Sequence, residues 1–191
     1  LCVREYQDGV FGAIQVIDEG EALFYPSVKD DGIHPVVVYN RQGVGFSDTI
    51  VATLGETVTL EKVNTAVKTY RPCFDHDGKG HCFVAYDLYN GVNYDVVVRA
   101  KIDGQWSEEV KLNQTAIYST HPVMTRVGQK VTIAWYENGK HCYFSNNVID
   151  VEVKDGQVVT SHYAVLTRIS RLLVSPFRRT KRAKLLWTAA N

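Results

Sequence analysis

Three short hydrophobic runs with similar surroundings define the pattern of this chain. The runs occupy residues 35–39, 82–86 and 131–135, and each ends in Tyr or Trp. A proline and a glycine separated by five residues precede each run: Pro26 and Gly32, Pro72 and Gly78, Pro122 and Gly128. The glycine permits the positive φ of a tight hairpin, and proline, which lacks an N–H, is expected to begin a strand. The pattern predicts a repeated unit that opens with an inner strand, a turn and a second strand buried on both faces.

Polar turns and outer strands follow each of these runs. In the most complete unit, a turn at 87–93 leads to a strand at 94–101, the turn Asp103-Gly104, and an edge formed by Trp106 and 110–112. The neighbouring units place outer strands at 49–52, 142–144, 148–153 and 158–159. Each unit is therefore predicted to be a four-stranded antiparallel sheet of about fifty residues, the size of a propeller blade.

The first 25 residues match the outer half of such a unit. At an offset of 95, Leu1-Cys-Val-Arg4 parallels Val96-Val-Val-Arg99, Asp8-Gly9 parallels Asp103-Gly104, and Phe11 stands where Trp106 stands. The chain is therefore expected to begin within a repeat, as a piece of a longer protein.

We predict an all-β fold, a β-propeller segment of consecutive four-stranded antiparallel blades that forms an incomplete ring. Its parts are the second half of a truncated blade at 1–25, blades at 26–71, 72–121 and 122–165, and a basic, irregular tail at 166–191. No fourth Pro-x5-Gly follows near residue 170, and seven Lys and Arg residues gather after Asp155, where no acidic residue occurs. The tail is interpreted as an unstructured or miscoded end, and the alternative is a basic anchor for an acidic surface or nucleic acid.

Composition narrows the functional classes. With 45% hydrophobic and 22% charged residues the chain has an ordinary globular balance, and its eleven Tyr, seven Phe and three Trp favour strands. The net charge is zero, so a basic tail leaves a mildly acidic body, and no nucleic-acid partner is expected. No run approaches the roughly eighteen apolar residues of a membrane span. Four cysteines show neither a CxxC pair nor the density of a disulfide scaffold.

The repeat resembles the sialidase-like (BNR-type) β-propellers, in particular the multi-blade repeats of secreted bacterial proteins. The matching segments are Tyr25-Pro-Ser-Val28, Asp31-Gly32, Ile133-Ala-Trp135, Asn93-Tyr-Asp-Val96 and Asp103-Gly-Gln-Trp106. The stricter Asp-box, Ser-x-Asp-x-Gly-x-x-Trp, is absent. The resemblance implies an extracellular or periplasmic location, with the remaining blades of the same polypeptide as structural partners.

Candidate ligand-binding residues follow from blade symmetry. The residue before each inner-strand proline occupies an equivalent place, which selects Tyr25, Arg71 and His121, with Tyr70 beside them. An aromatic ring, a guanidinium and an imidazole at one mouth of a propeller channel suit a carboxylate or sugar. The alternative is that each side chain caps its own strand end.

Two carboxylates are catalytic candidates. Asp87 and Glu137 are placed in equivalent turns, where they would form a pair for glycoside hydrolysis, or would be solvated turn acids.

A metal site is not predicted, although Cys73, His76, His81 and Cys82 include the residue types of a zinc site. A hairpin tip at Gly78-Lys79 would pair residue 76 with 81 and put both cysteines on one face and both histidines on the other.

The sequence favours a non-catalytic propeller segment of a larger extracytoplasmic bacterial protein, a binding or scaffolding module for a glycan or protein ligand, without a cofactor. The alternative function is a sialidase-like, glycan-active glycoside hydrolase with its site at the propeller mouth. A third hypothesis, nucleic-acid binding, depends on the basic tail.

Overall fold

The computed structural model describes residues 1–20, 22–114, 118–139 and 142–162 of the 191-residue chain. The tail predicted at 166–191 lies outside these residues. Within them the secondary structure is β-strand joined by turns, and all strand pairing in the sheets is antiparallel, so the prediction of an all-β antiparallel fold is confirmed. None of the described segments forms a helix of the length and apolarity that crossing a membrane requires.

Three larger sheets follow one another along the chain. The first sheet contains β5 (Leu23–Asp30), β6 (Pro35–Gly43), β7 (Phe46–Leu54) and β8 (Val58–Lys62) in that order. The second contains β9 (Thr69–His76), β10 (Cys82–Tyr89) and β11 (Tyr94–Ile102), whose outer edge pairs with two short strands, β12 (Gln105–Trp106) and β13 (Val110–Lys111). The third contains β14 (Tyr118–Val127), β15 (Lys130–Gly139), β16 (Cys142–Lys154) and β17 (Gln157–His162).

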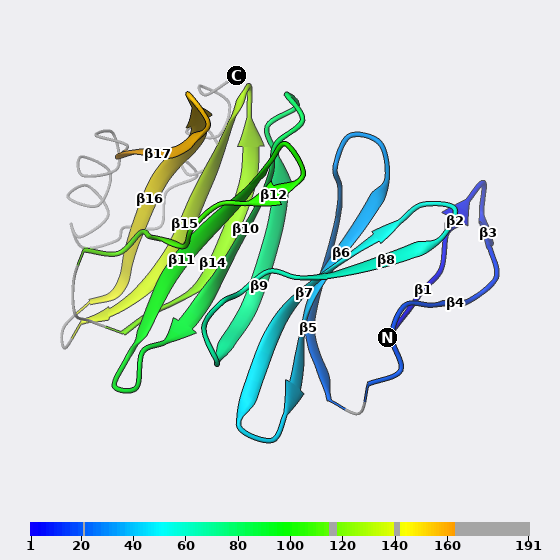
Figure 1. The fold of residues 1–191 in the computed structure, drawn as a ribbon, viewed down its shortest axis with the longest axis horizontal. Coiled ribbons are helices and arrows are strands. Elements are labelled where there is room, and N and C mark those ends of the chain that lie inside the picture. Colours follow the sequence, from blue (N-terminus) through cyan, green and yellow to red (C-terminus); the bar gives the residue numbers. More distant parts are fainter. Residues whose placement is uncertain (21, 115–117, 140–141, 163–191) are drawn as a thin grey trace, which may run out of the picture.

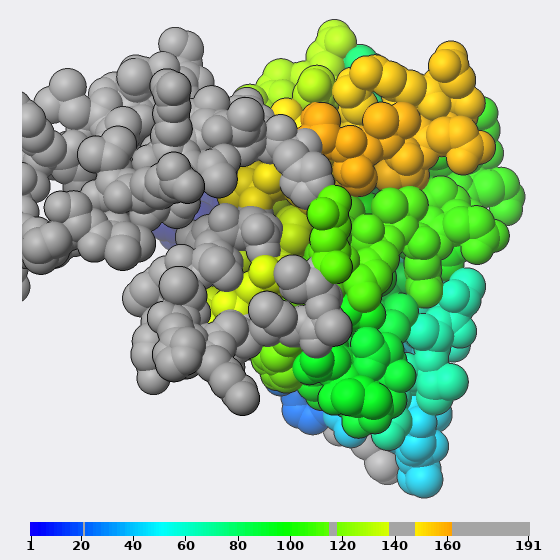
Figure 2. Space-filling model, turned by 90° about the vertical axis from the view of Figure 1, so that its left-hand side faces the viewer, coloured from blue at the N-terminus to red at the C-terminus, as the bar shows by residue number. Residues whose placement is uncertain are grey.

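The sheets stack face to face with their first strands in contact, β5 against β9 and β9 against β14 (Figure 1). Their outer strands follow one another along the opposite side, from β8 in cyan through green β12 and β13 to orange β17 (Figure 2). The described sheets do not close into a ring.

Hydrophobic cores fill the spaces between neighbouring sheets. Phe83 and Ala85 of β10 pack with residues of the third sheet such as Ile133, whereas Val84 and Tyr86 pack with Val38 of the first sheet. Because successive side chains of a strand point to opposite faces, β10 is buried on both sides, as its hydrophobic run predicts.

A β-bulge interrupts the first strand of each larger sheet. Residues 25–26 lie opposite Tyr39, residues 71–72 opposite Tyr86, and residues 121–122 opposite Trp135. Each bulge puts a residue other than glycine at positive φ directly before a proline: 55° at Tyr25, 50° at Arg71 and 57° at His121. The prolines therefore lie within their strands and do not begin them. A bulge leaves a residue unpaired, so the missing proline N–H costs no ladder hydrogen bond.

Residues 1–18 reproduce the outer half of the second sheet. β1 (Cys2–Val3) pairs with β4 (Gln15–Val16), and β2 (Tyr6–Gln7) pairs with β3 (Val10–Phe11). These pairings repeat those of β11 with β13 and β12 at an offset of 95. Ile17 N donates to Leu1 O at 2.9 Å, as Leu112 N donates to Val96 O at 2.8 Å. This half-unit covers the first sheet, where Ile17 packs against Tyr39.

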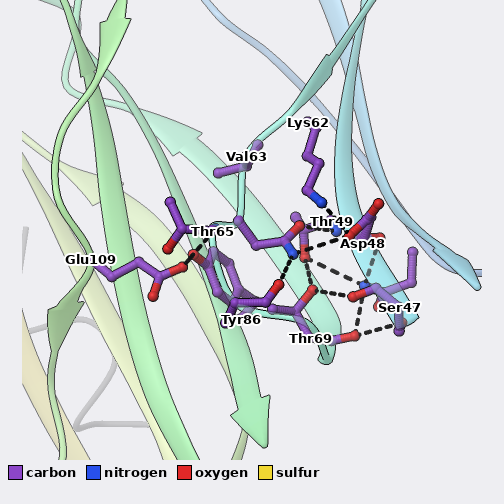
Figure 3. Close-up of polar contacts among 12 residues, drawn as sticks. Ser47, Asp48, Thr49, Lys62, Val63, Thr65, Thr69, Tyr86 and Glu109 are labelled. Atoms are coloured by element: carbon purple, nitrogen blue, oxygen red, sulfur yellow. Dashed lines mark hydrogen bonds and ion pairs between the residues drawn. The ribbon is translucent and has the colours of Figure 1, made fainter. Parts of the chain in front are cut away.

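A polar joint connects the first and second sheets (Figure 3). Ser47 Oγ donates to Thr69 O at 2.7 Å, Thr69 Oγ1 donates to Ser47 O at 3.0 Å, and the Thr49 and Thr69 hydroxyls are 2.8 Å apart. All three side chains are buried, so these bonds satisfy groups that are removed from water. On the other side of the joint, Tyr86 Oη donates to Glu109 Oε1 at 2.7 Å.

Two further local predictions, on the turn after β9 and on the outer strands of the third sheet, are wrong. The turn after β9 is one residue wider than expected, because Asp77 Oδ1 accepts from the Lys79 and His81 amides at 2.7 and 3.2 Å. His76 therefore pairs with Cys82 and not with His81. In the third sheet, the two outer strands predicted at 142–144 and 148–153 are one continuous strand, β16.

Candidate functional site

The three bulges converge on one cavity of about 360 Å³. Each bulge contributes three consecutive residues to its lining: Tyr25, Pro26 and Ser27; Arg71, Pro72 and Cys73; His121, Pro122 and Val123. The structure thus brings together the three residues that precede the prolines. It does so because β5, β9 and β14 lie side by side and are bulged at the same point. We call this cavity the mouth pocket.

Arg71 is the cation of the mouth pocket. Its Nε donates to Asp87 Oδ2 at 2.5 Å and its Nη2 donates to Thr120 Oγ1 at 2.7 Å, while its guanidinium carbon lies 5.8 Å from the ring centroids of both Tyr25 and Tyr94. Burial disfavours the charge of Arg71, but the pairing with Asp87 outweighs it and raises the pKa. Nη1 makes no hydrogen bond to the described residues, which leaves donors for a ligand.

Asp87 organises the other groups of the pocket. Its side chain is fully buried, and it links the second sheet to the third because Oδ2 accepts from Arg71 and Thr120 and Oδ1 accepts from the His121 amide at 2.9 Å. Burial raises the pKa of Asp87 to about 6, against the lowering effects of Thr120 and Arg71. The carboxylate is therefore ionised at pH 7 and protonated near pH 5.

His121 lies at the exposed rim of the pocket. Its Nδ1 is 3.2 Å from Thr120 Oγ1, and burial and the charge of Arg71 lower its pKa. At pH 7 the imidazole is therefore predominantly neutral and can donate or accept a hydrogen bond.

Tyr70 lies beside the pocket and is not among its lining residues. Its ring contacts Tyr94 edge-on at 5.7 Å, and Tyr94 also contacts Tyr89 at 5.2 Å and Tyr118 at 5.0 Å between ring centroids. These four residues form a tyrosine patch that Arg71 joins to the mouth pocket through Tyr94.

Asp87 and Glu137 do not occupy equivalent turns. Both lie within strands, and the register counterpart of Asp87 in the third sheet is Tyr136, because Tyr136 faces Thr120 as Asp87 faces Tyr70. Glu137 is buried and accepts from Ser119 Oγ at 3.2 Å. The prediction matched Asp87 and Glu137 by their distance in sequence from the aromatic residue that ends each hydrophobic run. It was wrong because equivalence depends on the strand register.

The cysteines and histidines near the β9–β10 turn have separate environments. Cys73 and Cys82 lie on opposite faces of the second sheet, since the wider turn shifts the register by one residue. Burial raises the pKa of both thiols, that of Cys82 to about 11. His81 Nδ1 contacts Asp77 at 2.7 Å, whereas His76 Nε2 lies 3.2 Å from Arg126. The described residues contain no group of three or more His, Cys, Asp or Glu side chains that could hold a metal ion.

Sequence reasoning missed Thr120, Tyr94 and Tyr118 as parts of this region. Thr120 directly precedes a selected residue, which was a usable signal, but the tyrosines come from strand ends that only the stacking of sheets brings together. No protein-family model matches the chain, nor does any curated protein or solved structure.

Proposed function

We propose that this chain is a segment of a β-propeller whose larger sheets are consecutive blades, and that it serves as a non-catalytic binding module for a glycan with a carboxylate group. In this proposal the remaining blades belong to the same extracytoplasmic polypeptide, as the resemblance to sialidase-like repeats implies. The observation that carries the proposal is the mouth pocket, where Arg71 stands between Tyr25 and Tyr94 and beside His121.

The chemistry of the pocket fits an acidic sugar. Nη1 and the second N–H of Nη2 can bind a carboxylate through two parallel hydrogen bonds. Proline and tyrosine side chains offer apolar surface to a sugar ring. Positive φ in three residues other than glycine costs about 1–3 kcal/mol each, and such strain gathers at binding sites because it orients side chains.

The same geometry disfavours hydrolysis by these residues. Both oxygens of Asp87 accept hydrogen bonds from the protein, so this carboxyl group has a positioning role and is not placed as a general acid. Burial, together with Tyr70 and Tyr118, raises the pKa of Tyr94, whereas an activated phenol nucleophile requires a lowered pKa.

Arg71→Lys tests the proposed site. We expect the chain to bind glucuronic acid or N-acetylneuraminic acid in calorimetric titrations, and not glucose. Lysine keeps the charge beside Asp87 but lacks the planar fork, so Arg71→Lys should weaken binding on the order of tenfold or more.

The matched control is Arg126→Lys. Arg126 lies on β14 five residues beyond His121, about 16 Å along the strand, and this variant should bind like the wild type. Equal affinities of the wild type and Arg71→Lys, or absence of binding of both acidic sugars, would contradict the proposed function.

Binding should also depend on pH. As the pH falls from 7 to 5, Asp87 becomes protonated and ceases to neutralise Arg71. Affinity for the acidic sugar should therefore rise severalfold, since the sugar carboxylate stays ionised over this range. In Asp87→Asn this increase should disappear, because the amide does not titrate. An affinity that falls on acidification of the wild type would contradict the prediction.

A further inference from the structure

The tyrosine patch continues the mouth pocket across two sheets. Its members come from four strands that meet at one end of the molecule: Tyr70 at the start of β9, Tyr89 at the end of β10, Tyr94 at the start of β11 and Tyr118 at the start of β14. This end is the lower one in Figure 1, where the loops that follow β6 and β10 also lie. All four rings are partly exposed.

Arg71 makes the pocket and the patch one surface. The guanidinium carbon is equally far, 5.8 Å, from the Tyr25 ring, which lines the pocket, and from the Tyr94 ring at the centre of the patch. A ligand whose carboxylate reaches Arg71 therefore has aromatic surface available on the side away from the cavity.

The patch has the chemistry of a sugar subsite. Tyrosine offers a rigid apolar ring and a hydroxyl at low cost in conformational entropy. Within the described part of the chain, Tyr89 Oη donates to Gly91 O at 2.8 Å, whereas Tyr70, Tyr94 and Tyr118 have no hydroxyl hydrogen bond. Their hydroxyls are thus available to a polyhydroxyl ligand.

A single-stranded nucleic acid would also stack on tyrosines, but it requires a row of cations along the backbone. Among the described residues, the cation in contact with the patch is Arg71, and Asp87 neutralises it at pH 7. A neutral sugar attached to an acidic one matches this arrangement, since it places one negative charge at Arg71 and an uncharged ring on the patch.

We propose that the tyrosine patch is a second subsite, which binds the neutral sugar next to the acidic sugar, so that the ligand is an oligosaccharide held by its acidic end. This inference rests on the proposed function and extends it from a monosaccharide carboxylate to a chain.

The test compares glucuronic acid and N-acetylneuraminic acid with disaccharides in which each is linked to one galactose, by calorimetric titration of the full chain. For the acidic sugar that binds, we expect its disaccharide to bind about tenfold more tightly, because stacking of the second sugar on an aromatic ring and hydrogen bonds to the tyrosine hydroxyls add to the contact at Arg71. In Tyr118→Ala the gain should fall below threefold, with the affinity for the monosaccharide unchanged.

Tyr70→Ala is the second variant, in case Tyr118→Ala does not fold. Tyr6→Ala is the control, because Tyr6 is an exposed tyrosine of β2 that lies outside the patch. This variant should keep the full gain in affinity for the disaccharide. The second subsite would be overturned, and the mouth pocket left intact, by equal affinities of the wild type for the monosaccharide and its disaccharide. A gain that persists in both Tyr118→Ala and Tyr70→Ala would have the same meaning. Absence of monosaccharide and disaccharide binding would overturn the proposed function together with this inference.

Discussion

Replacing Asp87 by Ala should lower the free energy of unfolding by about 3 kcal/mol. Removing one partner of a buried ion pair leaves the other charge uncompensated, which typically costs about 3–5 kcal/mol. Arg71 would lose its counter-ion, and the Thr120 hydroxyl and the His121 amide would lose their acceptor. Urea denaturation followed by circular dichroism measures the change.

A double-mutant cycle separates this pairing from a general loss of packing. If Asp87 and Arg71 stabilise each other, the double variant Arg71→Ala, Asp87→Ala should be less destabilised than the sum of the two single variants, by about 1–3 kcal/mol. Asp75→Ala is not a suitable control, because Asp75 also holds Lys29 and the Arg126 amide. Asp103→Gly is suitable, since Asp103 lies in an exposed turn with φ of 49°. An Asp87→Ala variant within 0.5 kcal/mol of the wild type would contradict the assigned positioning role.

Tyr86→Ala should destabilise the chain by about 3–5 kcal/mol, the usual effect of removing a large buried aromatic side chain. Tyr86 is fully buried, fills the space between the first and second sheets, and lies opposite the bulge at 71–72. Its hydroxyl also donates to Glu109, so Tyr86→Phe should cost about 1 kcal/mol by itself.

Tyr89→Ala is the control on the same strand. Tyr89 is partly exposed and its hydroxyl bonds locally to Gly91, so the loss should stay near or below 1 kcal/mol. Thermal or urea unfolding of the three variants orders these contributions. Similar losses for Tyr86→Ala and Tyr89→Ala would show that the space between the sheets is not a packed core.

The repeat in the sequence determined the strands and their order. Runs such as 82–86 are apolar at every position because both faces of the strand are covered, and Asp-Gly pairs such as Asp103-Gly104 mark hairpins because both residues adopt positive φ there. The match of residues 1–4 to 96–99 identified the half-unit, since equal side chains at equal spacing form equal strand pairings.

The equivalent prolines also led to Tyr25, Arg71 and His121. A repeated backbone places equivalent residues at equivalent points, so that three stacked sheets bring them to one cavity. What the repeat did not contain was the bulge: proline was expected at the start of a strand, whereas each first strand begins three or four residues earlier.

Register and contacts between sheets were decided by the tertiary structure. A turn widened by one residue through Asp77 moved Cys82 to the face opposite Cys73, and one residue of difference between Asp87 and Glu137 removed their equivalence. The partners of Asp87 are at positions 71, 120 and 121, on strands of two different sheets. These positions are far from Asp87 in sequence, and no local pattern indicates that they contact it. Local pattern fixes which residues face a neighbouring sheet, because side chains alternate along a strand, but which polar groups then meet depends on how the sheets are stacked and on where each bulge shifts the register.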